Sequence, residues 1–336
     1  MLIPFFISRL KFFRNLAWMY AIAGITLLGV VAVLGAVSHG AKLSFTVAGI
    51  TIQPSEFIKI IFVFFVAAMY HESTEFIQVV KTTTVAALHV IILVLSKDLG
   101  AALIFFIAYM VMLYVATRKI YYFLGGLLCG CLASVVGYYL FSHVRVRVIA
   151  WQDPLANFER EGNQISNSLF AIGTGGWFGM GLNQGMPNKI PEVKQDFIFS
   201  AVSEELGGIF ALCLILVCVS CFLMFLNIAM QMKDSFYKLV ALGLGTIYGF
   251  QVFLSVGGDI KFIPSTGVTL PLVSYGGSSL LSTLIIFAII QGLYLLRERE
   301  EQEPEINGTK KKKKKGGRAS HEETVKIHGT KVQNFD

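Results

Sequence analysis

Repeated apolar stretches, each about as long as a bilayer is thick, dominate this chain. A helix needs roughly 20 apolar residues to cross the hydrocarbon core, and its backbone amides must be hydrogen-bonded within the segment. The stretches lack the alternating pattern of membrane-spanning barrel strands. Only 15% of the residues are charged, against roughly 25% in soluble domains. The sequence therefore predicts an all-α polytopic membrane protein.

About eight membrane-spanning helices are expected, together with one large loop at 143–195. The approximate spans are 16–37, 54–70, 84–117 read as two helices with a turn at Lys97–Asp98, 121–141, 197–228, 239–256 and 270–296. The transmembrane domain then covers 1–296. The remaining residues, 297–336, form a charged tail that we expect to be disordered.

Lysine and arginine gather on one side of the predicted helices, which places that side in the cytoplasm. This side carries Arg118–Lys119 and the six-lysine run 310–315. Because the number of spans is even, both termini are expected in the cytoplasm and the loop 143–195 outside it. The lysine run is interpreted as a solvated tail or, alternatively, as a contact for anionic lipid. No structured module accompanies it that would indicate nucleic-acid binding.

Asp196 lies where the largest polar loop meets the apolar segment that begins at Phe197. Partial desolvation at such a boundary makes a carboxyl group a better proton acceptor. Ser200 and Ser203 follow at helical spacing and extend a polar stripe from Asp196, although a role in helix packing is an alternative for these serines. We predict that Asp196 acts as a general base.

Other ionisable residues lie in apolar surroundings, where they are costly and often functional. Glu56 and Lys59 share one helical face, so they are predicted either to pair structurally or to bind substrate. Asp98 is predicted either to bind substrate or to cap the helix that begins at Leu99. The glycine- and hydroxyl-rich segment 270–279 is typical of a broken helix start beside a polar cavity.

The large loop carries arginines and a glycine-rich run at 173–181, both of which are consistent with a pyrophosphate-bearing substrate. The glycine run lacks the spacing of a P-loop. The five cysteines are interpreted as small buried hydrophobic residues, and no metal site is predicted. The candidate substrate-binding residues are Lys42, Gln53, Ser55, Glu56, Lys59, Asp98, Arg145, Arg147, Gln164, Lys194, Glu204, Ser274, Tyr275 and Ser278.

Several motifs of a known family occur in order along the chain. They are Ile52-Gln53-Pro54-Ser55-Glu56, Asp98-Leu99-Gly100, Ala171-Ile172-Gly173 with Gly175-Gly176, Pro191-Glu192 with Asp196-Phe197-Ile198-Phe199, Glu204-Glu205-Leu206-Gly207 and Leu270-Pro271-Leu272-Val273-Ser274-Tyr275-Gly276-Gly277-Ser278-Ser279. On these residues the chain resembles the FtsW/RodA/SpoVE (SEDS) family over about 16–297. The last three motifs together are highly specific.

This resemblance implies a ten-span fold and a peptidoglycan glycosyltransferase that polymerises lipid II outside the cytoplasmic membrane, releasing undecaprenyl pyrophosphate. It implies a class B penicillin-binding protein as partner. Asp196 matches the essential loop aspartate of the family, and its implied role is to deprotonate the acceptor sugar 4-hydroxyl. No resident cofactor is expected, apart from a divalent cation that would accompany the pyrophosphate. The alternatives are a lipid II flippase and a catalytically weak scaffold for the penicillin-binding protein.

The chain departs from the family pattern at four places. The family has two further spans before the first span here, and this chain begins with what looks like the end of the second. Ser44 stands where the family has tryptophan, Lys194-Gln195 replace His-Thr before the aspartate, and Lys97 replaces a proline. The segment 270–277 leans toward the division and sporulation branch, but the sequence does not decide between division, elongation and sporulation.

Overall fold

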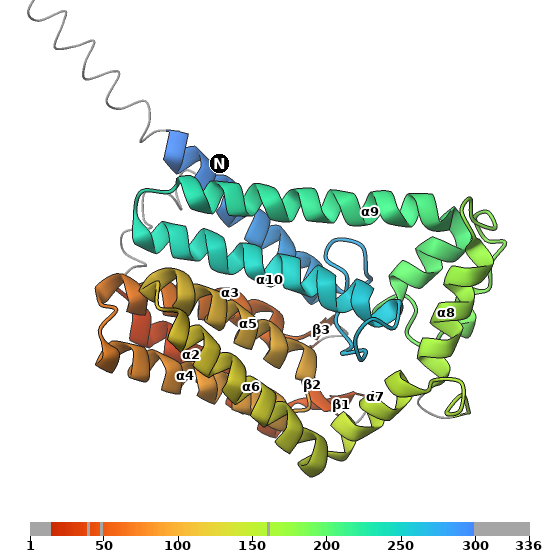
Figure 1. The fold of residues 1–336 in the computed structure, drawn as a ribbon, viewed down its shortest axis with the longest axis horizontal. Coiled ribbons are helices and arrows are strands. Elements are labelled where there is room, and N and C mark those ends of the chain that lie inside the picture. Colours follow the sequence, from red (N-terminus) through yellow and green to blue (C-terminus); the bar gives the residue numbers. More distant parts are fainter. Residues whose placement is uncertain (1–14, 39–40, 48–49, 160–161, 299–336) are drawn as a thin grey trace, which may run out of the picture.

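The computed structural model describes residues 15–38, 41–47, 50–159 and 162–298 (Figure 1). In these ranges, 8 helices are long and apolar enough to cross a membrane. They are α2 (Ala17–Leu34), α3 (Pro54–Glu72), α4 (Phe76–Leu95), α5 (Leu99–Thr117), α6 (Ile120–Leu140), α9 (Ile198–Gln231), α10 (Ser235–Asp259) and a final helix, Gly277–Glu298. The predicted all-helical, multi-pass membrane architecture is confirmed.

Two predicted helix boundaries are wrong. Helix α4 begins at Phe76, because the segment around Lys81 that looked like a polar loop continues the apolar helix. The final helix begins at Gly277 and not near 270, because the preceding residues form turns. The cysteines also differ from expectation: Cys218 is buried, whereas Cys129, Cys131 and Cys213 are exposed on the outer surface of the bundle.

Consecutive membrane-spanning helices alternate in direction, so their connections lie at two opposite ends. The connections 35–53, 96–98, 141–197 and 260–276 lie at one end, which we call the loop end, on the right in Figure 1. Arg118, Lys119, Lys233 and Arg297 lie at the opposite end, as the charge pattern predicted. The tail 299–336, with its lysine run, lies outside the described residues.

The loop end contains a small antiparallel sheet that was not anticipated within the helical fold. Strand β2 (Ala41–Val47) pairs with β1 (Ala36–Ser38) and, farther along, with β3 (Ile50–Ile52). Ser44 pairs with Ala36 in this register and is buried. Ser44 occupies the position that holds a tryptophan in the family, and this position is enclosed by the fold.

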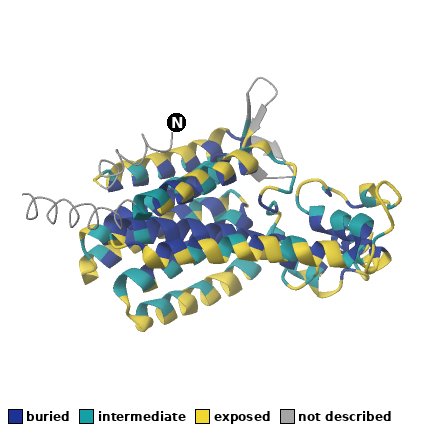
Figure 2. Ribbon diagram, turned by 90° about the horizontal axis from the view of Figure 1, so that it is seen from above, coloured by how far each residue is buried: buried dark blue, intermediate teal, exposed yellow. Residues whose placement is uncertain are grey.

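Helices α3 and α10 form the centre of the bundle, and α10 packs against α3, α5 and α9. Aromatic side chains fill the space between α3 and α5, where the rings of Phe62 and Phe105 lie 4.8 Å apart. Helix α6 has no buried residue and packs mainly against α5. Figure 2 shows this contrast between a buried centre and exposed outer helices. In a membrane the outer faces contact lipid.

Helix α9 is broken at Gly207, where φ is +88°. The break leaves the carbonyls of Glu204 and Glu205, and the amides of Gly208 and Ile209, without their helical partners. The glycine-rich run supplies all four partners: Met180 N and Gly181 N donate to Glu204 O (2.9 Å) and Glu205 O (3.0 Å), and Gly176 O and Trp177 O accept from Gly208 N (2.8 Å) and Ile209 N (3.2 Å). We call this pairing of 176–181 with 204–209 the clasp.

The clasp explains why the run 173–181 contains so many glycines, without requiring a bound phosphate. A Cβ on Gly179 would lie 2.2 Å from Glu205 O, and a Cβ on Gly175 would lie 2.0 Å from Ser203 O. Only glycine permits such close approach of two backbones. The amides of Met180 and Gly181 are already used by the protein. These two amides are therefore not free to bind the phosphate that the glycine-rich run was suggested to cradle.

The large loop contains two helices and docks on the connection after α10. Helix α7 (Ser142–Gln152) and helix α8 (Asn163–Gly175) stand at the loop end, followed by a short 3-10 turn, η1 (Pro187–Lys189). The Trp151 indole N–H donates to Lys261 O (3.1 Å), and the Arg147 guanidinium donates to Ser265 O (2.9 Å). These bonds hold α7 against the segment 260–268.

Candidate functional site

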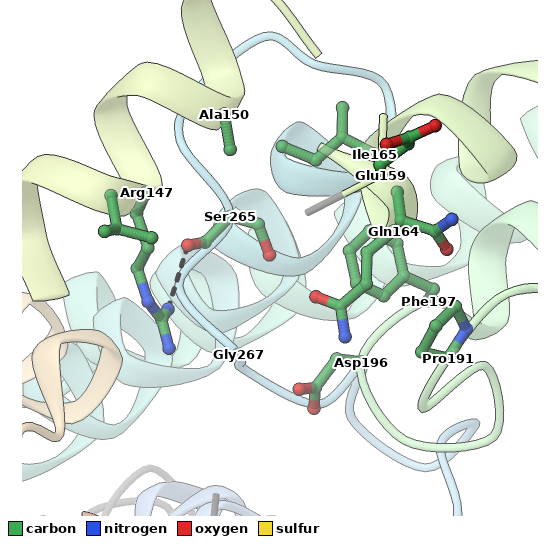
Figure 3. Close-up of a pocket in the computed structure, with 12 residues that line it drawn as sticks. Arg147, Ala150, Glu159, Gln164, Ile165, Pro191, Asp196, Phe197, Ser265 and Gly267 are labelled. Atoms are coloured by element: carbon green, nitrogen blue, oxygen red, sulfur yellow. Dashed lines mark hydrogen bonds between the residues drawn. The ribbon is translucent and has the colours of Figure 1, made fainter. Parts of the chain in front are cut away.

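A cavity of about 710 Å³ opens at the loop end between α7, α8, the start of α9 and the segment 265–267 (Figure 3). It brings together three of the predicted site residues: Arg147, Gln164 and Asp196. The lining residues are Val146, Arg147, Ala150, Glu159, Asn163, Gln164, Ile165, Pro191, Asp196, Phe197, Ser265 and Gly267. We call this cavity the Asp196 pocket.

Asp196 is fixed in the pocket by the chain on either side of it. Its amide donates to Glu192 O (3.1 Å) in the preceding turn. The next residue, Phe197, is 1% exposed and anchors the start of α9 in a small apolar cluster with Ile190 and Val193. The Asp196 side chain itself remains partly exposed. A rigid backbone thus presents an accessible carboxylate to the cavity, as a catalytic base requires.

Gly267 separates the Asp196 carboxylate from the Arg147 guanidinium. A Cβ built on Gly267 would lie 3.3 Å from Asp196 Oδ2 and 3.7 Å from Arg147 Nη2. The backbone at Gly267 has φ +72°, a conformation that side-chain-bearing residues rarely adopt. The glycine therefore allows an acid and a cation to converge on one side of the pocket, as Figure 3 shows.

Arg147 is a cation held near two acids. Burial lowers the pKa of its guanidinium, while the charges of Asp196 and Asp98 oppose that shift. An arginine remains protonated under such conditions because its ordinary pKa is far above neutrality. Arg147 also donates to Ser265 O, which fixes its direction. The pocket therefore contains a permanent positive charge suited to a phosphate oxygen.

Asp98 forms a second polar cluster behind Arg147. Its Oδ1 accepts from Ala101 N (3.1 Å), so the predicted cap of the helix that begins at Leu99 is confirmed. Its Oδ2 accepts from Ser55 Oγ (3.1 Å) and from Gln53 Nε2 (3.4 Å). The backbone amide of Gln53 donates to Ser278 Oγ (3.0 Å). Burial raises the pKa of the Asp98 carboxyl group.

Glu56 and Lys59 form the predicted ion pair, with 2.6 Å between Lys59 Nζ and Glu56 Oε2. Lys59 is 2% exposed and also donates to Gln251 Oε1 (2.8 Å), while Ser282 Oγ donates to Glu56 Oε2 (2.9 Å). The pair therefore joins α3 to α10 and to the final helix. These internal partners favour the structural interpretation, and a substrate contact at this pair stays a prediction.

The remaining predicted site residues lie apart from the Asp196 pocket. Glu204 Oε1 accepts from Met186 N (3.0 Å), which ties the loop to α9. Ser274 Oγ accepts from Leu270 N (2.8 Å), and Tyr275, 78% exposed, donates its amide to Lys194 O (2.7 Å). The side chain of Lys194 is exposed. The side chain of Lys42 lies outside what the structure describes.

Arg145 does not join Arg147 in the pocket. Its guanidinium donates to Tyr139 O (2.9 Å) at the end of α6 and stands over the ring of Tyr138, 5.8 Å from its centroid. The two arginines alternate along α7, so they point in different directions, which the sequence spacing of two already implies for a helix. Of these two arginines, Arg147 is the one that lines the pocket.

Asp259 is a buried acid near the site that the sequence reasoning missed. It is 1% exposed, and its Oδ2 makes no hydrogen bond among the described residues. Its carbonyl accepts from Ser168 Oγ (2.7 Å), and Ser168 Oγ lies 2.5 Å from Ser200 Oγ. Ser203 Oγ donates to Phe199 O (2.8 Å). The serines after Asp196 therefore hydrogen-bond within the protein, as the packing alternative predicted.

Glu159 was also missed as a pocket residue. Glu159 carries no motif of its own, whereas Asn163 belongs to the polar loop residues that the sequence placed near Asp196. The turn Pro264-Ser265-Thr266-Gly267 was expected near the outer mouth of the cavity, and Ser265 and Gly267 do line it. No group of three or more metal-binding side chains occurs in the part of the chain that the structure describes.

The sequence is similar to several characterised proteins. A family model described as a cell cycle protein matches residues 1–298. A peptidoglycan glycosyltransferase RodA of Mycobacterium tuberculosis is 37% identical over 306 residues, which cover 84% of this chain and 65% of that relative. Stage V sporulation protein E of Bacillus subtilis is 34% identical over 301 residues, covering 85% of this chain and 80% of that protein. The chain thus spans less than two thirds of the mycobacterial relative's length.

Solved structures share the fold. A chain from a peptidoglycan synthase complex, described as coordinating polymerization and crosslinking, superposes with a TM-score of 0.73 and 25% identity, over 88% of this chain and 86% of that chain. The crystal structure of the rod shape determining protein RodA of Thermus thermophilus superposes with a TM-score of 0.63 and 23% identity, over 88% and 83%. The second likeness concerns the fold alone.

Proposed function

The chain belongs to the FtsW/RodA/SpoVE family of cell cycle proteins, and on that premise we propose that it is a peptidoglycan glycosyltransferase that polymerises lipid II. Its relatives include proteins named for this activity. The observation that carries the proposal is the convergence of the Asp196 carboxylate and the Arg147 guanidinium on Gly267, within a cavity at the loop end. A base and a fixed cation side by side are what transfer of a sugar from a pyrophosphate requires.

In the proposed reaction Asp196 is the general base. Its carboxylate takes the proton of the acceptor sugar 4-hydroxyl, and the resulting oxygen attacks the anomeric carbon of the growing chain. A new glycosidic C–O bond forms while the C–O bond to the pyrophosphate breaks, and undecaprenyl pyrophosphate leaves with the electron pair. The Arg147 guanidinium, which lines the same pocket, would stabilise the negative charge that develops on the leaving group.

A divalent cation would share the pyrophosphate with Arg147. The Asp196 pocket offers two carboxylates, Asp196 and Glu159. Hard cations such as Mg²⁺ often bind through one or two carboxylates together with substrate phosphates. The side chains present therefore fit a cation that arrives with the substrate better than a resident one.

We further propose that the loop end faces outward from the cytoplasmic membrane and that both termini are cytoplasmic. The basic side chains at the opposite end support this orientation. A class B penicillin-binding protein is the proposed partner, since one matching chain comes from a peptidoglycan synthase complex.

The test is a polymerisation assay with the full chain, its cognate penicillin-binding protein and purified lipid II. Glycan polymer is separated on a gel for the wild type, Asp196→Asn and Asp196→Ala. We expect polymer from the wild type and none from either variant, because both remove the base. Polymer from Asp196→Ala at the wild-type rate would refute the proposed mechanism.

A lipid II flippase and a weakly active scaffold are distinguished by two further measurements. Translocation of lipid II in liposomes that persists in Asp196→Asn, without polymer from the wild type, would indicate a flippase. Partner binding without polymer from any sample would indicate a scaffold. The enclosed Glu56–Lys59 pair gives no specific support to a translocation path.

A further inference from the structure

An uncharged apolar segment protrudes from the loop beside the clasp. Trp177 is 71% exposed, Phe178 86% and Leu182 67%, and Met180 and Met186 are also exposed. Residues 173–186 contain no charged side chain. Exposed apolar clusters of this kind mark contact surfaces for protein or membrane. We call the exposed side chains of Trp177, Phe178, Met180, Leu182 and Met186 the apolar tip.

The apolar tip is held rigidly and is not a loose end of the loop. Four backbone groups at the break in α9, those of Glu204, Glu205, Gly208 and Ile209, are bonded to the backbone of residues 176–181. A Cβ on Gly207 would lie 2.5 Å from Trp177 O, and the Trp177 ring lies 3.9 Å from the Cβ position of Gly208. The first turn of α9 after Gly207 therefore fixes the direction in which the side chains of the tip protrude.

The position of the clasp along α9 sets its depth. Residues 209–226 form an almost purely apolar run that follows the clasp directly. At 1.5 Å per residue this run is about 27 Å long, close to the roughly 30 Å of a bilayer core. The hydrocarbon region therefore begins at Ile209, and the tip lies at that level. Ile209 and Phe210, both about half exposed, continue the same apolar surface into the lipid-facing side of α9.

We propose that the apolar tip inserts into the outer boundary of the bilayer, between the headgroups and the upper acyl chains. The tip contacts the lipid surface itself, because it is continuous with the lipid-facing side of α9 and carries no charge. Aromatic side chains are favoured at this depth, where an apolar ring and a polar N–H are both accommodated.

Insertion of the tip would tie one wall of the Asp196 pocket to the membrane boundary. Helix α8 begins at Asn163, which lines the pocket, and ends at Gly175, which precedes the tip. Its 13 residues form a strut of about 20 Å. Helix α8 thus connects the pocket wall that faces Asp196 to the apolar tip. The inference concerns a membrane contact and holds whichever reaction the pocket performs.

The experiment measures the fluorescence of Trp177 in the full chain reconstituted into phosphatidylcholine vesicles. The lipids carry bromine either near the headgroup or near the bilayer centre, and the signal of Trp177→Phe is subtracted from that of the wild type. We expect the Trp177 component to be quenched at least twofold by shallow bromines and less by deep ones. A Trp177 component that neither lipid quenches would overturn the proposal.

Two polar substitutions test whether the membrane contact is specific to the tip or common to all exposed apolar residues. Phe178→Asn should weaken the shallow quenching of Trp177 and shift its emission to the red, because the tip withdraws from the boundary. Leu155→Asn, at an exposed position before α8, is the matched control and should leave both signals unchanged. If Trp177 is unquenched in the protein alone and shifts only when the penicillin-binding protein is added, the tip is a protein interface and the lipid proposal is wrong.

Discussion

Substitution of Gly267 by alanine tests whether the acid and the cation must converge on this residue. Alanine would have to adopt φ +72°, which costs roughly 1–2 kcal/mol for a residue with a Cβ. Its methyl group would lie 3.3 Å from Asp196 Oδ2, so the carboxylate must move by a few tenths of an ångström. A misplacement of 1 Å costs on the order of 100-fold in rate. We therefore expect about a tenfold loss of polymerisation.

The assay is the initial rate of glycan synthesis by the reconstituted complex, with thermal unfolding of the detergent-solubilised protein measured in parallel. Gly277→Ala is the matched control, because a Cβ there meets nothing within 4 Å and the residue starts a helix. The control should keep both the rate and the unfolding temperature. If Gly267→Ala matches this control in both measurements, the close approach of Asp196 and Arg147 has no role in the reaction.

Three further predictions concern the fold around the site. Gly207→Ala should prevent recovery of folded protein in size-exclusion chromatography, because its Cβ would lie 2.4 Å from Gly179 N; Gly173→Ala, in open space, should not. Burial and two neighbouring cations lower the pKa of His143, so its stability contribution is intact above pH 6.5 and is lost as the pH falls through the lowered folded-state value. His143→Gln should flatten the acid side of the unfolding temperature profile, and an unchanged profile would contradict this cause. Burial raises the pKa of Asp98, so its contribution is present at low pH and is lost as the pH rises through that raised value; Asp98→Asn should therefore unfold at an equal or higher temperature near neutral pH, whereas Asp98→Ala should lose about 1 kcal/mol with the helix cap.

Local patterns in the sequence predicted what depends on local physics. Hydropathy located the spans, because each helix must satisfy its own backbone in lipid. The spacing of three between Glu56 and Lys59 predicted their pairing, and the position of Asp98 before Leu99 predicted its cap. These interactions form within one helix and need no knowledge of its neighbours.

The missed features depend on segments that are distant in the sequence. The carboxylate of Asp196 meets Arg147 and Gly267 only after α7 and the segment 260–268 dock together. The glycines of the run 173–181 were interpreted as a possible phosphate-binding loop. Nothing in their spacing indicates that they pair with a backbone segment about 30 residues later. Asp259 ends an apolar helix without any motif, so only tertiary packing places it near Asp196.

The clasp also bears on the order in which the protein is made. Residues 176–181 precede 204–209 in the chain, so the ribosome releases the glycine-rich run before the break in α9 exists. When the α9 segment enters the membrane, the backbone that will complete it has already been synthesised. The reverse order would leave four unpaired backbone groups waiting at the edge of the hydrocarbon. Biosynthesis from the N-terminus thus shortens the time during which this helix is incomplete.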